Sequence, residues 1–186
     1  MDDATPSYAL AFDTANEVIG LGRLDAAARS IELVASVEVE ARRASNTQLV
    51  PRIDELCARA GVAREKIACV CVGRGPGSFT GVRIALATAK GIASEIGLVG
   101  VSSLDAVAWG AWKAAERGEL LVVADAMRRE VYPVEYRLDD EGAVRLTADR
   151  VIKAEAFAEE LGATGSSDRS MADDGDAGDS RHGGNA

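Results

Sequence analysis

The chain has 186 residues, 47% of them hydrophobic, and carries a formal net charge of −9. This length suits one ordinary domain or two small lobes, and the apolar share supports a packed core. A nucleic-acid interface needs a basic surface, so a chain this acidic is not expected to be the main nucleic-acid binder of an assembly.

The single histidine, His182, excludes several kinds of catalytic and metal site from this chain. A Ser-His-Asp triad, a Cys-His pair and a two-histidine metal centre all need an imidazole placed in the fold, so a peptidase is excluded. The odd set of cysteines, Cys57, Cys69 and Cys71, predicts reduced thiols in a reducing compartment. The sequence shows no leader and no apolar run long enough to cross a bilayer, so we expect a cytoplasmic protein without membrane contact.

Three apolar runs open the chain and predict an antiparallel meander of strands over residues 8–12, 18–24 and 33–39. A helix should follow, with Asn46 or Thr47 as its cap and Gly61 at its end. Pro51 is expected to bend this helix or delay its start.

A strand over residues 67–72 leads into the stretch Gly-Arg-Gly-Pro-Gly-Ser-Phe-Thr-Gly, residues 73–81. Glycines at this density indicate a backbone with positive φ or a close approach to another group. Thr80 is expected to cap the helix that follows. The loop fits neither the Walker pattern nor G-x-G-x-x-G, so an anion site and a structural turn both remain open.

The helix after this loop, up to residue 96, is apolar on nearly all sides and should be covered on more than one of them. Gly81, Ala85, Thr88, Ala89 and Ile92 form a ridge of mostly small residues along it. This ridge is either a contact surface for a partner or the face that packs on the chain's own sheet.

The second half of the chain predicts shorter elements. We expect strands over residues 98–101, 120–124, 131–138 and 144–147, a helix capped by Ser102 and Ser103, and a short helix over 154–161. Pro133 suits an edge strand, and Asp125 is more readily a strand-end cap than a site. From residue 164 the composition predicts a disordered tail, a linker or an insertion.

The predicted order of elements is that of the ribonuclease-H-like lobe of actin, Hsp70 and sugar kinases. We expect an α/β protein with a mixed sheet, divided into a ribonuclease-H-like lobe over residues 1–117, the start of an incomplete second lobe over 118–163, and the tail over 164–186. The chain is then a fragment, a short form or a piece of a fusion.

The glycine-rich stretch resembles the signature of the bacterial TsaB family of tRNA threonylcarbamoyladenosine biosynthesis proteins, an actin-like family once grouped with glycoproteases. Further positions over residues 7–137 fit this family. They are Asp13-Thr14, Leu49-Val50-Pro51, Val82-Arg83-Ile84, Ala89-Lys90-Gly91, Val101-Ser102-Ser103-Leu104, Ala124-Asp125-Ala126 and Arg129-Glu130-Val131-Tyr132. The chain departs from the family at Ser45-Asn46-Thr47, where members often show His-Ser-Glu.

The resemblance implies a non-catalytic subunit of the complex that makes N6-threonylcarbamoyladenosine next to the anticodon in tRNA. Such a subunit forms a homodimer, or a heteromer with the threonylcarbamoyltransferase subunit and a small ATPase, and reaches tRNA only indirectly. It has no cofactor of its own, with ATP or ADP placed at a subunit interface. The alternative is an actin-like ATP-dependent small-molecule kinase, which would need a catalytic Asp and a complete second lobe.

Two sets of residues follow as candidates. The candidate nucleotide or phosphate site comprises Asp13, Thr14, Gly75, Gly77, Ser78, Thr80 and Arg83, with Asp13 also explained as a turn residue and Arg83 as a surface residue. The candidate partner interface, on the two helices that the resemblance implies for dimerisation, comprises Leu49, Ile53, Leu56, Gly81, Ala85, Thr88, Ala89 and Ile92. No metal ligands are assigned.

Overall fold

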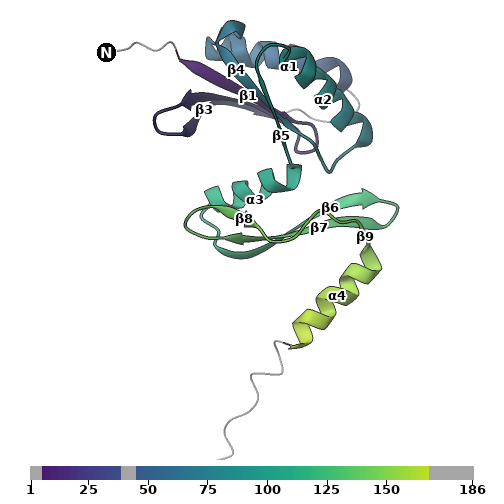
Figure 1. Cartoon of the computed structure of the whole chain (residues 1–186). Coiled ribbons are helices and arrows are strands. Elements are labelled where there is room, and N and C mark those ends of the chain that lie inside the picture. The colour runs from purple at the N-terminus through teal and green to yellow at the C-terminus, as the bar shows by residue number, and fades with distance from the viewer. Residues whose placement is uncertain (1–5, 39–44, 168–186) are drawn as a thin grey trace, which may run out of the picture.

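The computed structural model describes residues 6–38 and 45–167 of the chain. It contains two sheets, with one helix lying between them (Figure 1). Over these described ranges, no helix combines the length and the hydropathy that crossing a membrane requires.

The first sheet has five strands in the order β3-β2-β1-β4-β5. Its strands are β1 (Ser7–Asp13), β2 (Val18–Asp25), β3 (Ser30–Glu38), β4 (Ile67–Gly73) and β5 (Gly97–Val101). The first three are antiparallel, as apolar runs with short polar connections predict, whereas β4 lies parallel to β1 and β5 parallel to β4. This mixed order confirms the predicted ribonuclease-H-like, actin-type arrangement.

Helices α1 (Ser45–Ala60) and α2 (Phe79–Ile92) lie side by side on one face of this sheet (Figure 1). Their inward residues pack on buried sheet residues such as Leu10 and Val70, both fully buried. This packing buries the apolar stripe of each helix and forms the core of the first lobe. A 3₁₀ turn, η1 (Arg64–Lys66), leads from α1 into β4.

The structure corrects three predicted helix boundaries. Helix α1 begins at Ser45 and runs through Pro51, so Asn46 and Thr47 lie inside it and the proline does not delay its start. Helix α2 is capped by Ser78, whose Oγ accepts a hydrogen bond from the Gly81 N–H at 3.4 Å, so Thr80 is not the cap. Helix α2 ends at Ile92 rather than at residue 96. The end of α1 is as predicted, at Gly61, which has φ +64°.

The second sheet pairs β6 (Gly118–Met127) with β7 (Glu130–Leu138), and β7 also pairs with the short strands β8 (Ala143–Arg145) and β9 (Ile152–Lys153). Strand β7 therefore pairs on both sides along parts of its length, but at Pro133 it pairs only with β6, which is the local edge position predicted for this residue. Pro133 is accommodated there, because β9 pairs only at residues 130–131 and β8 only at 136–138. Its missing N–H thus falls between the two partner strands.

Helix α3 (Ser103–Lys113) packs on the second sheet. Its buried residues Leu104 and Ala108 join the core of that sheet, which includes Val134 and Tyr136. The sequence predicts this helix within a lobe ending at residue 117, but its core contacts lie with the strands that follow.

Helix α4 (Ala154–Ser167) follows β9 directly. It continues past residue 161, where the sequence predicts the helix to end, and past residue 164, where the sequence predicts a tail to begin. The remainder of that tail, including His182, lies outside the described residues.

Candidate functional site

The turn between β1 and β2 is closed by the carboxylate of Asp13. Its Oδ1 accepts the Ala15 N–H at 2.8 Å, and its Oδ2 accepts the Asn16 Nδ2–H at 2.9 Å. The same Asn16 amide donates to the carbonyl oxygen of Ser103, the first residue of α3, at 3.1 Å. With 8% of its surface exposed, Asp13 acts here as a turn residue, bonding its own backbone and linking it to α3 through Asn16.

The glycine-rich loop packs directly against this turn. A Cβ added at Gly73 would lie 2.2 Å from Asp13 Cγ, and one at Gly77 would lie 2.5 Å from Ala15 Cβ. Real side chains cannot approach that closely, so both positions require glycine. Gly75 has φ +88° and accepts the Ser103 N–H at 2.9 Å through its carbonyl oxygen. Turn, loop and the start of α3 therefore form one packed junction.

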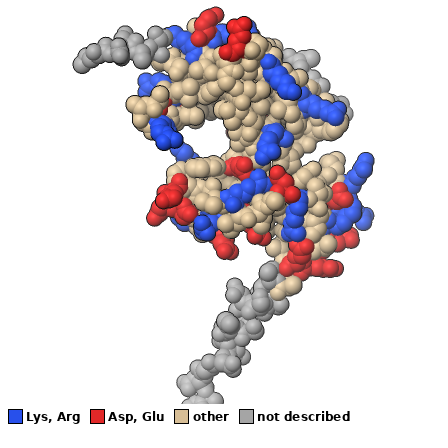
Figure 2. Space-filling model, viewed as in Figure 1, with Lys and Arg blue, Asp and Glu red and all other residues tan. Residues whose placement is uncertain are grey.

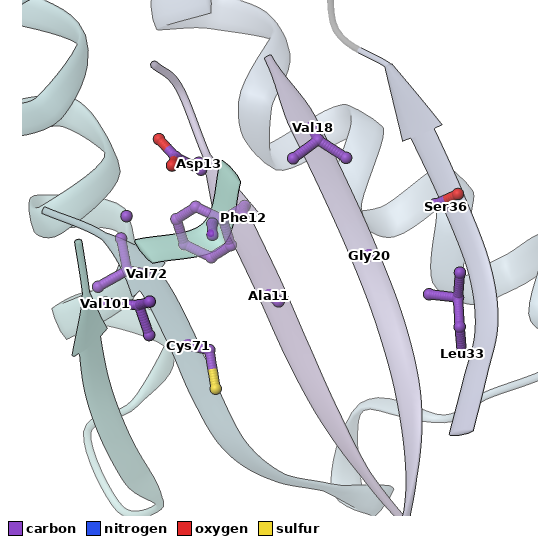
Figure 3. A pocket seen from close by; sticks show the side chains of 12 residues that line it. Ala11, Phe12, Asp13, Val18, Gly20, Leu33, Ser36, Cys71, Val72 and Val101 are labelled. Carbon is purple, nitrogen blue, oxygen red and sulfur yellow. The ribbon is translucent and has the colours of Figure 1, made fainter. Parts of the chain in front are cut away.

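A cavity of about 380 Å³ opens on the first sheet next to Asp13. Figure 3 shows Asp13 at the end of β1, with Cys71 and Val101 on neighbouring strands and Leu33 on β3. Most of the lining side chains are apolar, and Ala106 of α3 contributes one wall. Such a surface suits apolar contact better than a charged ligand.

The thiols of Cys69 and Cys71 lie near this cavity, on the same face of β4. Burial raises the pKa of Cys71, and the neighbouring Cys69 adds to that increase. A thiol with a raised pKa is mostly protonated at neutral pH and is a weak nucleophile. All three cysteines are free.

A polar cluster joins α3 to the second sheet. The hydroxyl of Tyr136 donates to Asp105 Oδ1 at 2.7 Å, and Arg145 Nη1 donates to the same oxygen at 3.1 Å. Arg145 also pairs with Asp149. Burial raises the pKa of Tyr136 above its ordinary value, with the Asp105 hydrogen bond and charge as further causes. The cluster fixes α3 on its sheet.

Comparison with known proteins places these features in a family. Residues 36–181 match the family model described as TsaD, tRNA N6-adenosine threonylcarbamoyltransferase. The tRNA threonylcarbamoyladenosine biosynthesis protein TsaB of Escherichia coli is 37% identical over 102 residues, which cover 54% of this chain and 44% of the relative. TsaB of Haemophilus influenzae is 30% identical over 125 residues, which cover 66% of this chain and 51% of the relative.

The solved structure of YeaZ from Pseudomonas aeruginosa superposes with a TM-score of 0.66 at 30% identity, covering 78% of this chain and 67% of that one. The chain belongs to the TsaB/TsaD family. It spans about half the length of the curated TsaB relatives that it matches.

Most of the predicted phosphate-site residues lie close together around the glycine-rich loop, where they pack against one another or cap a helix. Thr14 lies against Gly81, and Ser78 caps α2. The guanidinium of Arg83 lies over the ring of Phe79, with its Cζ 3.7 Å from the ring centroid. Thr80 is exposed on the first turn of α2. Among the described residues, no group of three His, Cys, Asp or Glu side chains is placed to hold a metal ion.

The residues predicted to contact a partner lie mostly inside the chain. Six of the eight are buried in the first lobe, and the other two, Thr88 and Ile92, are half-buried. The six are Leu49, Ile53, Leu56, Gly81, Ala85 and Ala89. They pack the helices onto the sheet, so they cannot themselves line an interface, and a substitution such as Ala85→Arg would disrupt the core. That α1 and α2 contact a partner stays a prediction, now for their outer residues.

Three residues of the junction were not predicted as site residues: Asn16, Arg74 and Ser102. Asn16 links the turn to α3, while Arg74 and Ser102 line a small cleft beside the glycine loop. The sequence does place Ser102 before a helix, but helix capping explains a serine there equally well.

Proposed function

We propose that this chain is a non-catalytic subunit in the biosynthesis of N6-threonylcarbamoyladenosine in tRNA, and that it acts by binding a threonylcarbamoyltransferase subunit. Family membership supports the pathway. The non-catalytic role is supported by the hydrogen bonds of Asp13 at the junction of the β1–β2 turn and the glycine loop. Both of its carboxylate oxygens accept hydrogen bonds from the chain's own turn. An actin-type phosphotransferase would need a carboxylate at such a position to act on a metal-bound phosphate.

The outer faces of α1 and α2 are the proposed contact surface. Phe79, at the start of α2, is 70% exposed, and Arg83 stacks over its ring. Val50 is exposed on α1. An aromatic ring beside an arginine is a favourable centre for an interface, because burying both contributes strongly to binding energy. The same surface would serve the homodimer and the heteromer in turn.

The transferase partner would hold the tRNA. The chain's net charge is −9, which does not favour binding of a polyanion. Figure 2 shows side chains of both signs on the face in view, mainly basic on the upper lobe and acidic together with basic on the lower one. The chain would act by binding the active conformation of its partner more tightly than other conformations, which shifts the population without chemistry of its own. A small ATPase would join this assembly and supply the ATP or ADP at a subunit interface.

Size-exclusion chromatography with light scattering tests this proposal. The purified chain is mixed with a threonylcarbamoyltransferase subunit, and the complex mass is measured for wild type, Phe79→Asp and the matched control Leu146→Asp. Leu146 is also exposed but follows the second sheet, away from α1 and α2. We expect wild type and Leu146→Asp to form the complex and Phe79→Asp to lose it. A complex unaffected by Phe79→Asp, or ATP turnover with a small-molecule acceptor by the chain alone, would overturn the proposal.

A further inference from the structure

Strand β6 forms an open edge of the second sheet. Its ten residues, Gly118–Met127, pair with β7 on one side. Strands β8 and β9 both lie on the far side of β7, so no strand within residues 6–38 and 45–167 covers the other side of β6 (Figure 1). An edge of this length presents a row of backbone donors and acceptors to a further strand.

The hydrogen bonds of Glu135 show which residues of β6 face the open edge. Glu135 lies opposite Leu121 in the register of β6 and β7. Its N–H donates to Thr147 Oγ1 at 2.9 Å and its carbonyl oxygen accepts the Leu146 N–H at 2.8 Å, both on the side of β7 away from β6. Leu121 and Glu135 are therefore a non-hydrogen-bonded pair, and Leu121 directs its own N–H and C=O to the open edge.

Val123 repeats this arrangement two residues further along. It lies opposite Pro133, which has no N–H with which to bind β6. The side chains of Leu121 and Val123 share the outer face of the sheet, where they are 36% and 45% exposed. Those of Leu120 and Val122 point to the other face and pack in the core under α3. The open edge thus combines free backbone positions with apolar side chains.

Strand β6 lacks the features that protect an open edge from pairing. No lysine or proline occurs in it, and its charged residues are Glu119 and Asp125, near its two ends. The Asp125 carboxylate is turned to the following turn, where its Oδ1 accepts the Met127 N–H at 2.7 Å. The stretch Leu120–Ala124 is apolar throughout. A long, apolar and unprotected edge is a surface for pairing with another chain.

The sequence of β6 suits pairing with a second copy of itself. Two identical strands pair antiparallel around a twofold axis, with one residue opposite its own counterpart. Centred on Leu121, this pairing places Glu119 opposite Val123, so no two charges of the same sign lie opposite each other. Centred on Val122, it would place Glu119 opposite Asp125, which is unfavourable because both are acidic.

A pairing centred on Val123 is also less suitable. It would extend into the end of β6, where the register with β7 shifts between Asp125 and Met127. The pairing centred on Leu121 stays within residues 118–124, which pair regularly with β7.

We propose that two copies of this chain associate through β6, in antiparallel pairing centred on Leu121, which joins their second sheets into one. Backbone hydrogen bonds from alternate residues hold the two strands together, and Leu121 and Val123 of both copies cover one another on the outer face. This interface lies on the second sheet, separate from the surface of α1 and α2 proposed for the transferase.

Sedimentation velocity of the full chain over a wide range of concentrations tests this interface. Phe79→Asp is present throughout, so that the proposed contact surface of α1 and α2 does not contribute to the mass. We expect a dimer when β6 is unaltered. Leu121→Lys and Leu121→Glu should each raise the dissociation constant about tenfold or more, because each places two like charges opposite one another. The matched control is Val144→Lys, since Val144 is also exposed but lies on β8, at the opposite edge of the second sheet.

Mixing the two Leu121 variants tests the register itself. In the mixture a positive charge of one copy lies opposite a negative charge of the other, so the dimer should return. Its return also shows that both variants are folded. The proposal is overturned by a chain that stays monomeric with β6 unaltered, by a dimer that Leu121→Lys leaves unchanged, or by variants that stay monomeric when mixed.

Amide hydrogen exchange followed by NMR locates the contact. The N–H groups of Leu121 and Val123 face the open edge, whereas that of Val122 faces β7. Raising the protein concentration should therefore slow exchange at Leu121 and Val123 more than at Val122. A dimer in which exchange at Leu121 and Val123 is independent of concentration would use another surface and contradict the proposal.

Discussion

Replacing Gly73 by alanine tests whether the glycine signature is a packing device. The added methyl group would lie 2.2 Å from Cγ of Asp13 and within 2.6 Å of both carboxylate oxygens. Asp13 has a short side chain held by hydrogen bonds to Ala15 and Asn16, so it cannot move away without breaking them. Either the backbone of β4 shifts or the turn opens.

The expected magnitude combines both costs. Overpacking a tight site typically destabilises a protein by about 1 to 3 kcal/mol. Loss of a hydrogen bond to a charged group adds about 1.5 to 3 kcal/mol. We therefore expect Gly73→Ala to lower the free energy of unfolding by about 3 kcal/mol or more, a large part of the stability of an ordinary domain.

Urea unfolding at 25 °C, followed by circular dichroism, measures this change. Gly91→Ala is the matched control, because Gly91 lies in α2 and an added Cβ there meets nothing within 4 Å. Since alanine has a higher helix propensity, Gly91→Ala should stabilise the protein by about 1 kcal/mol. Equal unfolding free energies for the two variants would refute the packing role of the loop.

Two further predictions follow from groups with raised pKa values. Tyr136→Phe should lower the free energy of unfolding by about 2 kcal/mol at pH 7 through loss of the Asp105 hydrogen bond. The folded protein holds the pKa of Tyr136 above its unfolded value of about 10, so the free energy of unfolding of the wild type should fall as the pH rises above that value. The difference in unfolding free energy between the wild type and Tyr136→Phe should therefore shrink. Urea titrations that give the same difference at pH 8 and above pH 10 would contradict this. The raised pKa of Cys71 predicts slower alkylation by iodoacetamide at pH 8 in the folded protein than in urea, measured by mass spectrometry, and equal rates would contradict it.

The first lobe could be predicted from the sequence because its signals are local. Apolar runs with short polar connections predicted the antiparallel meander of strands, and the order of the predicted strands and helices indicated the mixed sheet. Gly61 ended its helix as expected, since positive φ at a helix end favours glycine. Family resemblance then supported the same arrangement from independent residues.

The site could be predicted only in part, because the roles of its residues depend on contacts far apart in sequence. The density of glycines indicates close approach but does not say what approaches, and the group turned out to be the chain's own Asp13 turn. The spacing of apolar residues on α1 and α2 likewise does not tell whether these residues pack inside the lobe or contact a partner. In the structure Ala85 and Ala89 are fully buried inside the lobe. Ser102 and Arg74 meet in one cleft through tertiary packing that the sequence does not show.

The most direct test of the central claim is a titration of this chain into a fixed amount of the threonylcarbamoyltransferase subunit, with tRNA, the small ATPase and the substrates present. The amount of modified adenosine formed per minute is recorded at each ratio. A non-catalytic subunit should raise the rate until about one chain is present per transferase, and Phe79→Asp should need far more protein for the same rate. A rate that is independent of the chain, or that reaches its maximum at a small fraction of the transferase concentration, would contradict the account.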